Sequence, residues 1–112
     1  MAMIGFSEDL THEFKSDKSR LPDQDMIDAV VAFANTDGGE VYLGVEDSEE
    51  ITGLHKAHMD STRLAAFIAN KTVPPVSVRV EFLNLALPVL KISVPKYTIG
   101  ARPVMSVTVS CH

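Results

Sequence analysis

The stretch IDAVVAFANTDGGEVYLG, residues 27–44, decides the fold of this 112-residue chain. From Ile27 to Ala34 the apolar side chains recur at the i, i+3, i+4, i+7 spacing of one helical face. A helix with such an apolar face needs a surface to pack on. The Asn-Thr-Asp-Gly-Gly run that follows favours a helix stop and an immediate chain reversal, because glycine adopts positive φ freely. The sequence therefore predicts a packed helix that ends in a tight turn.

A buried strand is predicted directly after this turn. Residues 41–45 form a near-continuous run of apolar and β-branched side chains, which is typical of a strand covered on both faces. Other segments of the chain also show helix or strand periodicity. In chain order we expect a strand at 11–15, a helix that Asp23 caps, strands at 40–46 and 51–54, a helix from 59 or 60 that Pro74-Pro75 ends, strands at 76–83 and 87–94, and an edge strand at 105–109.

This order of elements, β-α-β-β-α-β-β with a further β, favours an α+β fold with two helices packed on a mixed β-sheet. At 46% hydrophobic residues the chain is expected to form a single domain, residues 1–112, with a core of its own. Cys111 is the only cysteine, so no disulfide forms within the chain. No apolar run approaches the roughly 20 residues that span a bilayer, and no secretory signal is present. We expect a cytoplasmic protein without membrane association.

The charge of the sequence is unevenly distributed. Residues 1–54 carry 13 acidic and 3 basic side chains, whereas residues 55–112 carry 2 acidic and 7 basic ones. The net charge of −5 argues against a simple electrostatic binder of nucleic acid, which usually has a basic domain. If the fold keeps the two parts on different faces, an acidic, cation-attracting site lies beside a basic surface. The alternative is that the acidic residues only make the first part of the chain soluble.

Three blocks of the sequence resemble the Schlafen/AlbA-type domain, a family of DNA-binding domains in bacterial transcriptional regulators and in Schlafen proteins. The first block is SEDLTHEFKS at 7–16, which is similar to the family's Glu-Ser-x-x-x-Glu-Phe-Lys opening. The second and most specific block is AFANTDGG at 32–39 with LGVED at 43–47. The third is ITGL at 51–54, followed by a helix and VPP at 73–75. The resemblance covers roughly residues 6–98.

The resemblance implies a nucleic-acid-binding module, with DNA as the expected partner, that serves a transcriptional regulator. The family's later Tyr-x-Arg strand is not recognisable after Arg102-Pro103, so the chain is either a complete domain with a divergent tail or a fragment of a longer regulator. Schlafen members with ribonuclease activity imply an alternative, a metal-dependent endoribonuclease with three carboxylates. Glu8, Glu13 and Asp47 occupy the matching positions.

The three carboxylates have both a functional and a structural interpretation. Converging carboxylates do not all stay ionised without a cation, so a hard metal such as Mg²⁺ or Mn²⁺ would be their cofactor. Lys15 would then hold the scissile phosphate of the RNA. In the structural interpretation Glu8 is a helix-start acid, Glu13 pairs with Lys15 or Lys71, and Asp47 is a turn residue. No other cofactor is expected. Both interpretations remain open from the sequence.

Basic residues of the second part of the chain are candidates for phosphate contacts. Together with Lys15, the candidates are Lys71, Arg79, Lys91 and Arg102. Arg79 and Lys91 lie on the polar faces of their predicted strands, so a basic strip across the sheet is feasible, although a solvated face explains them equally well. Aromatic residues are scarce, so recognition of single strands by base stacking is not indicated.

Other interpretations are weaker. The histidines at 55 and 58 are expected to face solvent and not to bind zinc, because no cysteine lies nearby. The glycines follow a helix and precede a strand, the reverse of a phosphate-binding loop. A third hypothesis is a homo-oligomer that acts as a scaffold, for which the tail strand at 104–109 offers an edge.

Overall fold

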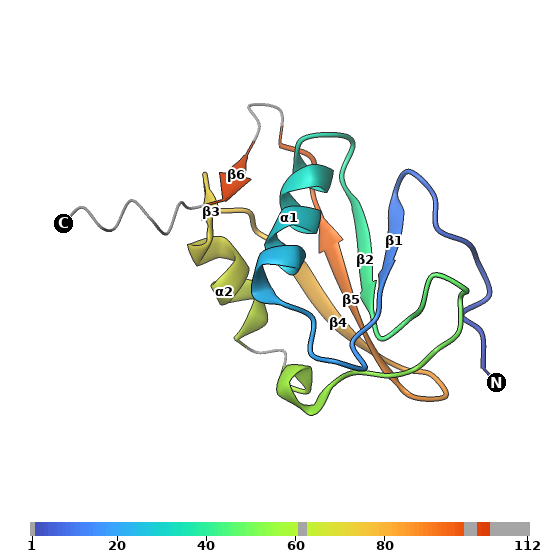
Figure 1. Ribbon diagram of the computed structural model, residues 1–112. Helices are drawn as coiled ribbons and strands as arrows, with labels where there is room; N and C mark the ends of the chain where they lie inside the picture. The colour runs from blue at the N-terminus through green and yellow to red at the C-terminus, as the bar shows by residue number, and fades with distance from the viewer. Residues whose placement is uncertain (1, 61–62, 98–100, 104–112) are drawn as a thin grey trace.

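The computed structural model describes residues 2–60, 63–97 and 101–103, and its main element is a four-stranded sheet (Figure 1). The strands lie in the order β1-β2-β5-β4. β1 and β2 are parallel, and the other neighbours are antiparallel. The predicted mixed sheet is therefore confirmed. Its strands are β1 (His12–Lys15), β2 (Gly39–Leu43), β4 (Arg79–Asn84) and β5 (Pro88–Val94).

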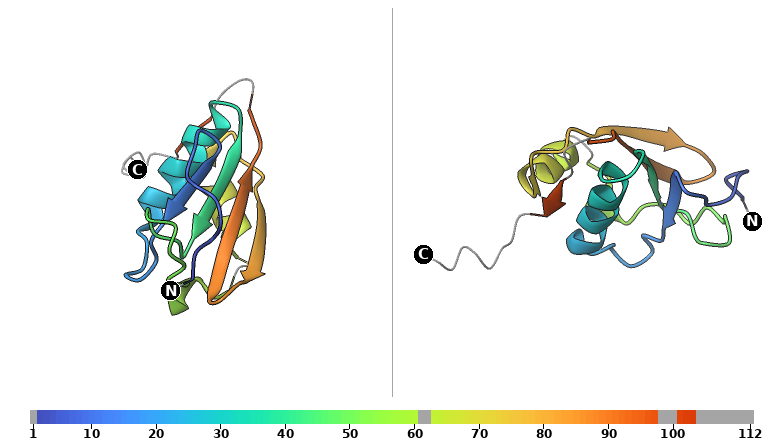
Figure 2. Two further views of the ribbon diagram at one scale, coloured as in Figure 1. Left: turned by 90° about the vertical axis from the view of Figure 1, so that its right-hand side faces the viewer. Right: turned by 90° about the horizontal axis from the view of Figure 1, so that it is seen from above.

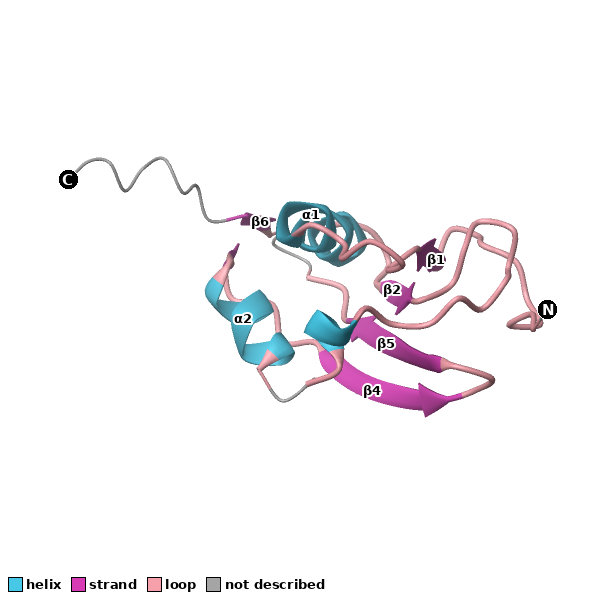
Figure 3. Ribbon diagram, turned by 60° about the horizontal axis from the view of Figure 1, so that its bottom comes forward, coloured by secondary structure: helices cyan, strands magenta, loops and turns pink. Residues whose placement is uncertain are grey.

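Two helices pack on one face of this sheet, as predicted (Figures 2 and 3). α1 (Asp23–Ala34) crosses over between the parallel strands β1 and β2. α2 (Leu64–Asn70) contacts β4 and the two-residue strand β3 (Thr72–Val73). β3 pairs with β6 (Arg102–Pro103) in a second, small sheet. None of the helices in the described ranges has the length and apolarity needed to cross a membrane.

The main core lies between α1 and the sheet. α1 buries the residues of its predicted apolar face, and Val30 and Ala34 are fully inaccessible to solvent. They pack in one cluster with Leu43 of β2 and Ile92 of β5. Ile68 of α2 belongs to the same cluster, so both helices share this core. Burial of these side chains is the main favourable contribution to folding, at about 25 cal/mol per Å² of apolar area.

A second, smaller cluster lies on the opposite face of the sheet. Phe14, Tyr42 and Val89 are buried there, although no described helix covers them. The N-terminal segment covers them instead, because Ile4 donates its backbone N–H to Glu49 and Phe6 packs against the ring of Tyr42. β2 is therefore covered on both faces, which confirms the prediction from its continuous apolar run.

The reversal after α1 follows the predicted pattern. The helix ends at Ala34, and the backbone N–H of Gly38 donates to the carbonyl of Phe33 at 2.9 Å. Gly38 has a φ of 78°, and a Cβ there would lie only 2.7 Å from the carbonyl oxygen of Val94. The backbone of the turn thus lies directly against the end of β5, and only glycine fits.

Some predicted elements are wrong. Residues 51–54 form no strand; only the single bridge between Val45 and Ile51 is made. The reason is that Gly53 has a φ of 89° and donates, like Thr52, to the carbonyl of Gly44, so the chain turns instead of extending.

The boundaries of the helices also differ from the expectation. Asp23 is the first residue of α1 and not its cap, which is Pro22 without a side-chain hydrogen bond. The second helix begins at Leu64 and ends at Asn70, well before Pro74-Pro75, and the segment before it includes the short 3₁₀ helix η1 (Lys56–His58). On β4, the apolar side chain of Phe82 is 37% exposed. The predicted strand at 105–109 lies outside the described residues.

Replacing Gly38 with alanine should lower the free energy of unfolding by about 2 kcal/mol or more, since a Cβ adds a clash with the Val94 carbonyl to the cost of positive φ. Urea denaturation measures this. The matched control is Gly5→Ala, where φ is 95° but nothing lies within 4 Å of the new Cβ. Equal losses in the two variants would contradict the proposed close approach of turn and strand.

Candidate functional site

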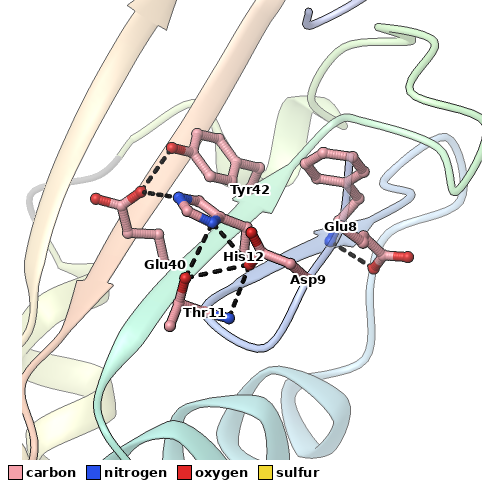
Figure 4. A network of polar contacts seen from close by, with 7 residues as sticks. Glu8, Asp9, Thr11, His12, Glu40 and Tyr42 are labelled. Atoms are coloured by element: carbon pink, nitrogen blue, oxygen red, sulfur yellow. Dashed lines mark hydrogen bonds and ion pairs between the residues drawn. The ribbon is translucent and has the colours of Figure 1, made fainter. Parts of the chain in front are cut away.

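A network of polar side chains lies on the face of the sheet opposite α1 (Figure 4). Alternate residues of β1, β2 and β5 point to this face, and Glu40 of β2 is at the centre of the network. Its carboxylate accepts a hydrogen bond from the Tyr42 hydroxyl at 2.8 Å. The same carboxylate lies 3.2 Å from Nε2 of His12 and 3.3 Å from Nζ of Lys91. One carboxylate thus ties together three neighbouring strands.

His12 lies between two carboxylates. Its Nδ1 is 2.9 Å from Oδ1 of Asp9, and its Nε2 faces Glu40. Asp9 also accepts the backbone N–H of Thr11 at 2.8 Å, which closes the turn before β1. This backbone hydrogen bond is the main reason why the pKa of Asp9 falls to about 2, and the hydrogen bond with His12 adds to it.

The network also shifts the pKa values of Glu40 and Tyr42. Partial burial raises the pKa of Glu40, but hydrogen bonds from Tyr42 and Lys91 outweigh it and hold this pKa below its usual range. Burial raises the pKa of the Tyr42 hydroxyl, and the neighbouring Glu40 carboxylate raises it further. Glu40 is therefore an ionised acceptor at neutral pH, and Tyr42 is a neutral donor.

The three carboxylates implied by the resemblance make separate local contacts. Oε2 of Glu8 accepts the backbone N–H of Phe14 at 2.9 Å, on the free edge of β1 (Figure 4). Glu13 faces the α1 side of the sheet and pairs with Lys15 at 2.7 Å. Asp47 is exposed in the loop after β2. Among the described residues, no three His, Cys, Asp or Glu side chains are arranged to hold a metal ion.

Lys15 is the neighbour that the carboxylates have in common. The hydrogen bond with Glu13 is the main reason why the pKa of Lys15 is raised, and the charges of Asp25 and Glu8 contribute to it. Lys15 also lines a pocket together with Glu46 and Asp47. The ammonium group of Lys15 thus already neutralises the carboxylate of Glu13. As they are placed, these side chains do not fit a divalent ion, and we derive no chemical step through one.

Glu46 belongs to this pocket, but the sequence alone did not single it out. It accepts a hydrogen bond from Thr52 at 2.6 Å. Burial raises the pKa of Glu46, but hydrogen bonds from Ser16 and Thr52 and the charge of Lys18 together hold it below its usual range. Two acidic residues, Glu46 and Asp47, thus line this pocket together with Lys15.

The candidate phosphate-binding residues fall into separate groups. Arg79 and Lys91 lie on the same face of the sheet, but Glu81 is directly opposite Lys91 and Glu40 contacts it. This face is a mixture of charges and not a basic strip. Lys71 immediately precedes β3, and Arg102 on β6 pairs with Val73, so these two cations lie at the small sheet. Arg79, Lys71 and Arg102 are exposed.

The strand order keeps the acidic and basic parts of the chain apart. β1 and β2 belong to acidic residues 1–54 and are neighbours, whereas β5 and β4 belong to basic residues 55–112. α2, β3 and β6 also belong to the basic part. They lie together next to α1, on the left in Figure 1. The two parts of the chain therefore form different strands of the sheet, although β2 pairs with β5 and the acidic helix α1 contacts both β5 and β6.

Comparison with known families matches residues 8–106 to the family described as Schlafen, AlbA_2. The chain belongs to this family. At the level of the family, this makes it a nucleic-acid-related domain.

The crystal structure of the DIP2311 protein from Corynebacterium diphtheriae is similar to this AlbA_2 domain, with a TM-score of 0.59 and 22% identity over 84% of the chain. The match covers 25% of that protein, so the chain spans about a quarter of its length. At this identity the similarity supports the fold alone. Curated proteins gave no significant match.

Sequence reasoning missed several residues of the AlbA_2 domain. The alternation Glu40-Val41-Tyr42 was a signal that Glu40 and Tyr42 share a face, but their partners His12 and Lys91 are set by the strand pairing. The expectation that the two linker histidines face solvent is wrong for His58, which is only 6% exposed.

The lowered pKa of Glu40 predicts a pH-dependent contribution to stability. Glu40→Gln should reduce the free energy of unfolding at pH 7 by up to about 1 kcal/mol, since the variant loses charged hydrogen bonds with Lys91 and His12. Because the pKa of Glu40 is lower in the folded state than its ordinary value of 4.5, the ionised carboxylate stabilises the fold above pH 4.5. This stabilisation is lost as the pH falls through the folded-state pKa. The difference between wild type and variant should therefore shrink towards pH 3.

Denaturation curves of both proteins across this pH range provide the test. Glu81→Gln is the control, because the Glu81 carboxylate lies on the same face but makes no hydrogen bond or ion pair with another described residue. A difference for Glu40→Gln that stays constant from pH 7 to pH 3 would contradict the assignment.

Proposed function

We propose that this AlbA_2 domain binds nucleic acid, with DNA as its partner, as the DNA-binding part of a transcriptional regulator. The observation that carries the proposal is the separation of charge by the strand order, in a chain whose family is nucleic-acid-related. The exposed cations of the basic part contact backbone phosphates in two groups, Lys71 and Arg102 at the small sheet and Arg79 on β4. The acidic side, around β1 and β2, repels phosphate and so orients the domain.

Not all five candidate cations are equally suited to this role. Lys15 is engaged by Glu13 at 2.7 Å, and Lys91 lies 3.3 Å from Glu40. Binding phosphate through either of them would weaken an existing ion pair. Arg79 and Arg102 make no ion pair with a described residue, and guanidinium groups bind phosphate oxygens in a bidentate way. The proposed interface therefore rests on the basic side and not on the centre of the sheet.

The affinity for a DNA duplex should fall steeply with rising salt, because binding releases counterions from the phosphates. Arg79→Gln and Arg102→Gln should each weaken binding and lower the salt slope by about one. Fluorescence anisotropy with a labelled duplex at several salt concentrations measures both quantities.

The matched control is Lys18→Gln, which removes one exposed positive charge from the acidic part of the chain. This variant should keep the salt slope of the wild type. An affinity that does not depend on salt, or equal effects of all three variants, would refute the proposed interface.

Metal-dependent cleavage of RNA by Glu8, Glu13 and Asp47 stays a second hypothesis, which the pairing of Glu13 with Lys15 disfavours. If the domain only binds, incubation of tRNA with Mn²⁺ should give no cleavage above that of Glu13→Ala and Asp47→Ala. Gel analysis of the RNA measures this. Cleavage by the wild type that is lost in both variants would instead establish the nuclease.

A further inference from the structure

A buried aspartate and a buried histidine form a pair that the proposed function does not use. Asp17, after β1, is completely inaccessible to solvent, and His58, in η1, is 6% exposed. Oδ2 of Asp17 lies 2.8 Å from Nδ1 of His58 and also accepts the backbone N–H of His55 at 2.8 Å. Oδ1 accepts the backbone N–H of Leu21 at 2.8 Å. The carboxylate is thus fully engaged, and it fixes both the position and the orientation of the imidazole ring.

The other ring nitrogen of His58 has no partner. Nε2 is buried and makes no hydrogen bond to any described residue. Leaving a buried polar atom unpaired costs about 1–3 kcal/mol, so such atoms in folded proteins nearly always have a partner. Because Asp17 accepts the hydrogen of Nδ1, Nε2 is the ring nitrogen that is left without a partner.

His58 lines a pocket of about 320 Å³ between η1, α2 and the segment before α1. Two arginines, Arg20 and Arg63, lie on its wall, together with the apolar side chains Leu64 and Phe67. Asp23 also lines the pocket, but it is neutralised by Arg20 at 2.9 Å. Asp60 is the other acid on the wall. Arg63 makes no ion pair with a described residue, so its guanidinium is available.

We propose that this pocket binds a phosphate group through Nε2 of His58 and the guanidinium of Arg63. With a phosphate oxygen as acceptor, Nε2 carries the second ring proton, and the buried Asp17 behind the ring balances the charge of the imidazolium. Arg63 supplies further charged donors to the other oxygens. The apolar wall of Leu64 and Phe67 then contacts the organic part of a phosphomonoester.

This proposal does not depend on the binding of duplex DNA. Lys71, Arg79 and Arg102 do not line the pocket, and a single phosphate group fills a different role from a row of backbone phosphates. The phosphomonoester has two possible sources, the terminal phosphate of a nucleic-acid strand or a small phosphorylated molecule. Both present the same group to His58 and Arg63.

Titration of the ¹⁵N-histidine-labelled protein with inorganic phosphate tests the proposal directly. The Nε2 resonance of His58 should shift in a saturable way, and chloride at the same ionic strength should not reproduce the shift. Arg63→Gln should weaken phosphate binding by about fivefold or more, as expected for loss of a charged hydrogen bond. Because Arg63 is exposed, this variant should not disturb the fold.

Lys56→Gln is the matched control, since Lys56 is an exposed cation of η1 that does not line the pocket. It should leave phosphate binding unchanged. Two short single strands, one with a 5′-phosphate and one with a 5′-hydroxyl, distinguish the sources. If the strand with the 5′-phosphate binds more tightly than the strand with the 5′-hydroxyl, the ligand of the pocket is a strand end. If both strands bind equally and inorganic phosphate still shifts the His58 resonance, the ligand is a small phosphorylated molecule.

The proposal is overturned if phosphate shifts the His58 ring no more than chloride does, or if Arg63→Gln binds phosphate like the wild type. Duplex binding that does not depend on salt, or that Arg79→Gln leaves unchanged, together with an intact phosphate response would refute only the proposed DNA interface. The two proposals therefore fail independently.

Discussion

The packing of α1 on β2 and β5 is the constraint on which the rest of the structure depends. α1 connects two parallel strands, so it must cross over on one face of the sheet and end where β2 begins. The turn at Gly38 makes this possible because its backbone lies directly against the end of β5. With α1 and α2 on one face, the other face is left for the N-terminal segment and for polar side chains.

This arrangement explains how charge is distributed over the domain. Neighbouring strands β1 and β2 come from the acidic part of the chain, and β5 and β4 come from the basic part. At the boundary between them, Glu40 of β2 meets Lys91 of β5. Lys71 and Arg102 lie at the small sheet, away from this boundary, and the pair of Asp17 and His58 lies in a separate region between η1 and α1. The two proposed phosphate sites therefore lie in different regions of the domain.

The candidate carboxylates illustrate how far sequence spacing can be interpreted. Glu8 and Glu13 are five residues apart, but a turn separates them, and Glu8 bonds to the strand edge while Glu13 faces α1. Spacing along the chain does not specify which face or edge a side chain takes when a turn intervenes. The structural interpretation of Glu13, as a partner of Lys15, is the contact that the structure contains.

The sequence by itself determined the helix at 23–34, its stop before Gly38, the buried strand β2 and the α+β class, because these depend on local periodicity and on backbone preferences. It also placed the chain in its family. The tertiary structure alone decided the partners of Glu40 and the burial of His58 against Asp17, which is 41 residues away. It also decided that the predicted strand at 51–54 does not form. These features depend on contacts between distant segments, which local patterns do not encode.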